Sequence, residues 1–65
     1  MTDVEFGQAV RIKRVELGMS QQDLARKAKI SNTTVCAAEN AQKQVQPKTK
    51  LALAIALGVD PKEWM

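Results

Sequence analysis

A helix-start pattern that occurs twice, eleven residues apart, limits what this 65-residue chain can fold into more than any other feature. Ser20 and Ser31 each follow an apolar residue, and each stands four positions before another apolar residue. A serine N-cap flanked in this way forms a hydrophobic staple, which fixes how the chain enters a helix. Asp23, three positions after Ser20, can complete a capping box there. The repeat therefore predicts two short helices, over residues 21–28 and 32–41, joined by a turn of a few residues.

Similar start signals occur near both ends of the chain. In each case a threonine or aspartate stands three positions before a glutamate, as in a capping box; the pairs are Thr2 with Glu5 and Asp60 with Glu63. Gly18 and Gly58 are suited to helix C-termini, and Pro47 is suited to a first helical position. These signals predict three further helices, over residues 3–17, 47–57 and 61–65, with a polar connection over residues 42–46.

We expect these helices to form a single all-α domain over residues 1–65, with the pair of N-capped helices at about residues 20–41. A chain of this length buries only about 60% of the surface that its unfolded form exposes, so the core is small. Helical spacing places the core side of the first helix at Phe6, Val10 and Leu17. The sequence shows no alternation of polar and apolar residues typical of a strand.

The charge and residue types of the chain exclude several classes of function. Ten basic residues against seven acidic ones give a net charge of +3 and a pI near 9.4, which favours a polyanionic partner. The chain has no histidine and a single cysteine, Cys36, so it lacks the commonest zinc ligand and general base and has no internal disulfide. We therefore expect no enzymatic activity, no metal and no cofactor. The longest apolar run, residues 51–59, is far shorter than the about 20 residues of a membrane-spanning helix, so no membrane partner is expected.

An ordered set of residues, from the end of the first helix to the end of the fourth, resembles a known family. The set is Arg14-Val15-Glu16-Leu17-Gly18-Met19-Ser20-Gln21, Leu24-Ala25, Ile30-Ser31, Thr34-Val35, Glu39 and Leu57-Gly58-Val59. It resembles the phage repressor and Cro family, also called XRE-like helix-turn-helix proteins, over nearly the whole chain. The resemblance implies a compact five-helix, lambda-repressor-like fold, a homodimer, and sequence-specific binding to a two-fold DNA operator in transcription control. It also implies a cytoplasmic, nucleoid-associated protein of bacterial or phage origin.

The resemblance assigns DNA base contacts to the third helix, which enters the major groove in this family. The residues implied are Asn32, Thr33 and Cys36. An asparagine can pair with adenine through two hydrogen bonds, and a threonine methyl can pack on thymine. The alternative for Asn32 and Thr33 is ordinary helix-start polarity. Cys36 stands where many relatives carry Arg, Gln or Ser, so Arg-mediated readout of guanine is absent there; the alternatives are a small helix residue and a redox-sensing thiol.

The resemblance assigns phosphate contacts to residues around the same helix pair. Gln21 matches a family glutamine that hydrogen-bonds a DNA phosphate at the start of the second helix, where free N–H groups and the helix dipole favour an anion. The other residues implied are Thr34, Asn40 and Lys43. The alternative for all four is a solvated position in a first helical turn or a loop.

Two further residues, Arg14 and Glu39, have a structural role in the family. The resemblance implies a partly buried ion pair between them, which fixes the recognition helix against the first helix. Ala25 stands where the second helix passes the third closely, so a small side chain is expected. Lys29 stands where a glycine commonly makes the turn between these helices, and a left-handed lysine costs about 1 kcal/mol.

The fourth helix is apolar all the way round, which is unusual for a surface helix. We expect Leu53 and Leu57 to face the core and Ile55 to point outward, so that Ile55, Trp64 and Met65 form a dimer or partner interface. The main hypothesis is a dimeric DNA-binding regulator. An antirepressor that binds a partner repressor protein through the fourth helix is the alternative, and an antitoxin or a restriction-modification controller protein of the same fold also remains open.

Overall fold

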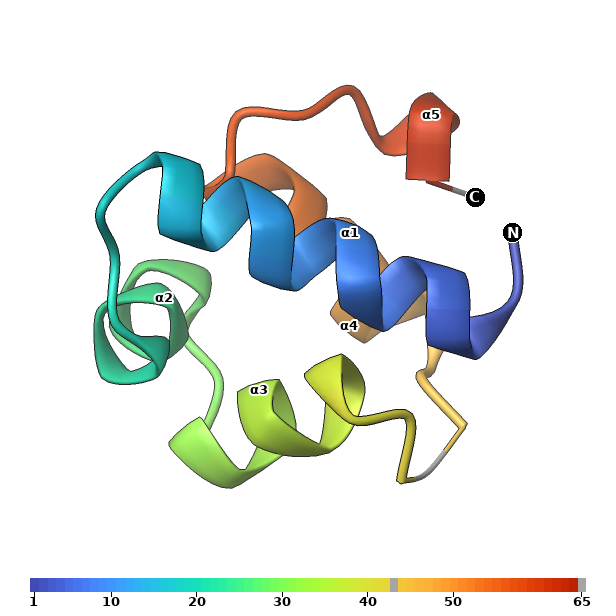
Figure 1. Ribbon diagram of the computed structural model, residues 1–65, viewed down its shortest axis with the longest axis horizontal. Coiled ribbons are helices and arrows are strands. Elements are labelled where there is room, and N and C mark those ends of the chain that lie inside the picture. The colour runs from blue at the N-terminus through green and yellow to red at the C-terminus, as the bar shows by residue number, and fades with distance from the viewer. Residues whose placement is uncertain (43, 65) are drawn as a thin grey trace.

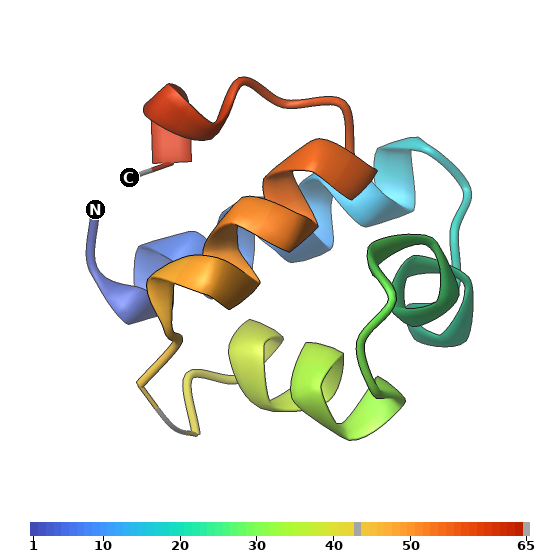
Figure 2. The same ribbon diagram turned by 180° about the vertical axis from the view of Figure 1, so that it is seen from behind.

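The structure is a computed structural model that describes residues 1–42 and 44–64. Within these residues the chain forms five α-helices and no strand, which confirms the all-α prediction. The helices are α1 (Asp3–Glu16), α2 (Gln21–Ala28), α3 (Asn32–Glu39), α4 (Pro47–Ala56) and α5 (Pro61–Trp64). The largest difference from the predicted bounds is at α3, which ends two residues earlier than expected. In Figures 1 and 2, α1 and α4 cross at the centre, with α2 and α3 on one side and α5 on the other.

Side-chain caps fix where the first three helices begin. Two reciprocal capping boxes form at α1 and α2; the pairs are Thr2 with Glu5 and Ser20 with Asp23. Ser31 Oγ accepts the N–H of Thr34 at 3.1 Å and so caps α3. The capping box predicted at α5 is wrong in detail, because Asp60 Oδ1 accepts the N–H of Lys62 at 3.0 Å. Asp60 therefore closes a local turn of the kind that aspartate commonly forms with the residue two positions on.

The core lies between α1, α4 and the α2–α3 pair. Its fully buried large side chains are Phe6, Val10, Leu24, Val35 and Leu53. Leu57, as predicted, is also buried. Leu17 is an error of the sequence prediction, since 48% of it is exposed. Because α1 ends at Glu16, Leu17 is the C-cap residue and lies outside the regular helical register.

One close approach between helices depends on a residue that the sequence analysis overlooked. A Cβ on Gly7 would lie 2.5 Å from the carbonyl O of Ala38 and 2.6 Å from that of Glu39. Only a glycine therefore lets the α1 backbone pass this close to the C-terminal end of α3. This contact, with the ion pair described below, sets where the third helix lies against the first.

Candidate nucleic-acid interface

The turn between α2 and α3 is made without a glycine. Lys29 follows α2 in the left-handed region, with φ 61° and ψ 41°, and the next N–H, that of Ile30, donates to the Ala25 carbonyl at 3.0 Å. Ile30 packs against the core, and Ala25 is buried as expected. The left-handed lysine costs about 1 kcal/mol, which the packing on both sides of the turn offsets. The turn thus packs α3 against α2 and leaves Asn32 and Thr33, at the start of α3, exposed to solvent.

At the start of α3, the side chains of Asn32 and Thr33 make no hydrogen bond to other described residues. Asn32 and Thr33 are exposed, and Cys36 lies one turn further along, half-buried. Asn40 Nδ2 donates to Cys36 Sγ at 3.3 Å, a contact that the sequence analysis did not expect. The structure therefore gathers Asn32, Cys36 and Asn40 along one side of α3. An amide, a thiol and a second amide can each exchange hydrogen bonds with a base edge or a phosphate.

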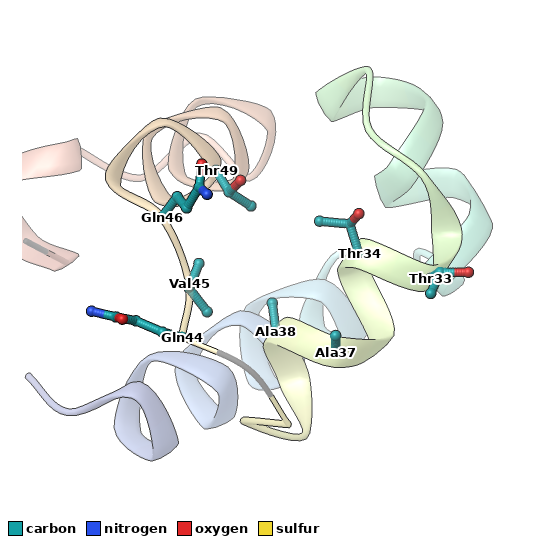
Figure 3. A pocket seen from close by; sticks show the side chains of 8 residues that line it. All are labelled: Thr33, Thr34, Ala37, Ala38, Gln44, Val45, Gln46 and Thr49. Carbon is teal, nitrogen blue, oxygen red and sulfur yellow. The ribbon is translucent and has the colours of Figure 1, made fainter.

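Thr34 faces a small hollow beside α3. Its Oγ1 lies 2.7 Å from Ser31 Oγ, so its hydroxyl is already part of the helix cap. Figure 3 shows the hollow, of about 220 Å³, between α3 and the segment that leads into α4. Thr33 and Thr34 line one side, and Gln46 and Thr49 line the other. The amide of Gln46 and the hydroxyl of Thr49, at the start of α4, thus lie across the hollow from α3.

The start of α2 offers free backbone N–H groups next to α3. The first intrahelical bond runs from Leu24 N–H to Ser20 O, at 3.1 Å, so the N–H groups of Gln21 and Gln22 precede it. Such groups, with the helix dipole, suit an anion. The Ser20 backbone N–H, which donates to the Asp23 carboxylate at 3.0 Å, lowers the pKa of Asp23 below its ordinary value. Asp23 therefore remains ionised well below neutral pH, and the capping box that it forms with Ser20 persists there.

Arg14 and Glu39, which the resemblance paired, meet in the structure. Arg14 Nε donates to Glu39 Oε2 at 2.7 Å and Arg14 Nη2 to Oε1 at 3.2 Å, while Arg14 Nη1 donates to the Met19 carbonyl at 2.8 Å. The Glu39 side chain is fully buried. The pair therefore fastens α1, the turn before α2 and the end of α3 to one another. Gln21 Nε2 also donates to Glu39 Oε1, at 3.2 Å, which the sequence analysis did not foresee.

Of the residues predicted to form a partner surface, Ile55 is exposed and Trp64 is buried. Ile55 is 63% exposed on α4, and Leu51, one turn earlier, is exposed beside it. Trp64 is only 8% exposed, because its ring packs edge-on against Phe6 with centroids 5.6 Å apart. Trp64 is therefore a core residue, and its assignment to the interface is corrected. Lys43 and Met65 lie outside the described residues.

The described residues hold no group of three or more acidic or cysteine side chains placed to ligate a metal ion. None of the described helices has the length and apolar character needed to span a bilayer.

Comparisons with known proteins agree with this geometry. A model of a helix-turn-helix family, HTH_3, matches residues 10–64. Among solved structures, the chain is similar to the restriction-modification controller protein C.AhdI from Aeromonas hydrophila, with 35% identity and a TM-score of 0.89. That similarity covers 97% of this chain and 96% of the other. No curated protein matches the sequence. The predicted resemblance is thus confirmed: the chain belongs to the helix-turn-helix family and is a DNA-binding transcriptional regulator.

Proposed function

We propose that this protein is a transcription controller of a restriction-modification locus and binds a two-fold operator as a dimer. The observation that carries the proposal is its likeness to a controller protein over nearly the full length of both chains. The likeness includes all five helices and therefore the whole arrangement around α3. In this proposal the protein acts by binding DNA and catalyses no reaction.

The open side of α3 supplies the base contacts in this proposal. Asn32 and Thr33 are exposed at its first turn, where a recognition helix meets base edges. Cys36, one turn on, offers a small and weakly polar surface to the groove. With no arginine on this side of α3, we expect sequence preference to rest on adenine and thymine contacts.

Phosphate contacts surround that side of the helix. Gln21 approaches the DNA backbone from the start of α2, and Asn40 does so from the end of α3. The Thr34 hydroxyl, which contacts Ser31 Oγ in the cap, has a further hydrogen-bonding position for a phosphate. Lys43 adds a positive charge in the sequence between α3 and α4. Phosphate contacts fix the position of a protein on the duplex and make its affinity depend on salt.

Self-association would place two copies of α3 on one face of DNA. Ile55 and Leu51 form an exposed apolar strip on α4, which supports a two-fold contact through this helix. Burying one such side chain contributes about 1.5–3 kcal/mol, and a two-fold interface counts it twice. The operator half-sites would then lie about 34 Å apart, one turn of DNA.

The function is tested by selecting duplexes from a random library with the full chain. We expect a palindromic sequence to be enriched, and the same sequence to lie upstream of the gene for this protein beside genes for an endonuclease and a methyltransferase. Enrichment of no sequence, or binding that is insensitive to salt, would overturn the proposal. A toxin gene at the selected site would indicate an antitoxin instead.

The dimer contact is tested with Ile55→Lys, measured by sedimentation. We expect the charged side chain to weaken self-association strongly and to leave the melting temperature of the monomer unchanged, since Ile55 lies outside the core. Lys48→Ala, another exposed α4 substitution, is the matched control. An unchanged dimer would place the interface elsewhere.

A further inference from the structure

Three donor groups surround one carboxylate oxygen of Glu39, which is one more than that oxygen can accept. Oε2 is taken by Arg14 Nε at 2.7 Å. Around Oε1 lie Arg14 Nη2 at 3.2 Å, Gln21 Nε2 at 3.2 Å and Arg11 Nε at 3.7 Å. A carboxylate oxygen has two lone pairs in its plane, so two of these three donors fill it. Arg11, beyond hydrogen-bond distance, is the donor left out.

Arg11 lies close enough to Glu39 Oε1 to replace either Arg14 Nη2 or Gln21 Nε2 as a donor. Its side chain is 60% exposed, and it lies on α1 one turn before Arg14. A shift from 3.7 Å to an ordinary N–H···O distance of about 2.9 Å is less than the movement of an exposed side chain between rotamers. Arg14 cannot supply a further hydrogen bond to Glu39 Oε1. Its Nε and Nη2 already bond the carboxylate, and its Nη1 donates to the Met19 carbonyl.

Gln21 is the donor whose departure would leave Glu39 Oε1 in need of another hydrogen bond. It is half-buried at the first position of α2, and in the free protein its amide nitrogen points inward to Glu39. If that amide turns to a DNA phosphate, a fully buried carboxylate oxygen loses a hydrogen bond, and leaving a buried charged acceptor short of donors is costly. Without compensation this cost would be subtracted from the binding free energy.

We propose that Arg11 is a positioning residue that takes over Glu39 Oε1 when Gln21 turns outward to the DNA backbone. The inference rests on the proposed phosphate contact of Gln21. The exchange leaves the bond between Arg14 Nε and Glu39 Oε2 in place, so the end of α3 does not move. It also keeps the charge of Arg11 paired with a carboxylate, and Arg11 therefore does not count among the cations that neutralise phosphates.

A double-mutant cycle tests the exchange. The variants are Arg11→Gln, Gln21→Ala and the double substitution, and the probe is a labelled duplex selected from a random library by the unaltered protein. We expect Arg11→Gln to raise Kd about five- to tenfold in the normal background and less than about twofold beside Gln21→Ala, because coupled residues are not additive. Lys62→Gln, which removes one exposed charge on α5, is the matched control and should have the same small effect in both backgrounds.

The salt dependence of binding gives a second readout that a direct DNA contact by Arg11 would change. We expect the slope of log affinity against log salt to be the same for Arg11→Gln and the normal chain, whereas loss of a phosphate contact lowers it by about 0.9. A lowered slope, or an equal effect of Arg11→Gln in both backgrounds, would overturn the exchange. Normal affinity of Gln21→Ala would overturn the phosphate contact and the exchange together. Failure to select any duplex would instead contradict the proposed function itself. Thermal melts of all variants establish that each is folded.

Discussion

The two ends of α3 are held in different ways. At the C-terminal end, Glu39 is buried and paired with Arg14, and α1 passes so closely that Gly7 has no room for a Cβ. At the N-terminal end, Ser31 caps the backbone while Asn32 remains exposed. The position of the helix is thus determined at one end, and the side chains at the other end are free to serve a partner. Substitutions at the fixed end should change stability, and those at the open end should change recognition.

The largest effect is expected from Arg14→Ala at the fixed end. Removing the guanidinium leaves the buried Glu39 carboxylate without its main partner, which costs about 3–5 kcal/mol. A domain this small has a total stability of only about 5 kcal/mol, so about 0–2 kcal/mol remains and the variant should be marginally folded at 25 °C, with a greatly lowered melting temperature in circular dichroism. Arg26→Ala, which breaks the exposed pair with Asp23, is the control and should cost less than about 1 kcal/mol. A similar small loss for both variants would show that the buried pair does not hold α3.

Gly7→Ala tests the same end through packing alone. Alanine favours a helix by about 1 kcal/mol over glycine, yet here its methyl group meets two carbonyl oxygens of α3. We expect a net loss of about 1–3 kcal/mol in urea unfolding, because the helices must move apart. Gln8→Ala, at the exposed neighbouring position, is the control and should be neutral or slightly stabilising. A stabilised Gly7→Ala would contradict the close approach.

Asn32→Ala tests the open end. Its side chain contacts nothing that holds the fold, so stability should change by less than about 0.5 kcal/mol. Discrimination between the selected duplex and random DNA should fall by about 1–3 kcal/mol, whereas Lys43→Ala should weaken both alike. The measurement is fluorescence anisotropy with both duplexes. Unchanged discrimination by Asn32→Ala would remove this residue from the base contacts.

The smallest effect is expected at the turn between α2 and α3, which leads into the open end of α3. Gly18 and Gly58 take a left-handed conformation after α1 and α4, but Lys29 does so with a side chain. Lys29→Gly should therefore raise stability by about 1 kcal/mol in thermal unfolding. Lys27→Gly, inside α2, should lower it by a similar amount. A loss of stability in Lys29→Gly would show that the lysine side chain contributes more than its backbone costs.

The sequence was sufficient to predict the helices because their start signals are local. A cap and its partner lie within three residues of each other, so Ser20 with Asp23 and Thr2 with Glu5 could be recognised without knowledge of the fold. The meeting of Arg14 with Glu39 came from the family resemblance, since no local rule relates residues 25 positions apart. The helix bounds were predicted closely because the caps are local, whereas the contact between Arg14 and Glu39 is not.

The errors and omissions concern contacts between elements. Trp64 was expected to face a partner, but the return of α5 toward the start of α1 buries it on Phe6. The restriction on Gly7 and the bond from Gln21 to Glu39 likewise depend on how α1, α2 and α3 meet. Periodicity within one helix carries no information about which residues of another helix will lie opposite.

The burial of Trp64 has an optical consequence. It is the one tryptophan of the chain, and its indole packs against Phe6. Its helix, α5, lies on the side of α1 away from α3 (Figure 1). Its fluorescence emission should therefore be blue-shifted in the folded chain and move to longer wavelength when α5 separates from α1. A ligand bound along α3 should leave this emission unchanged, so a single intrinsic fluorophore can follow unfolding without a contribution from DNA.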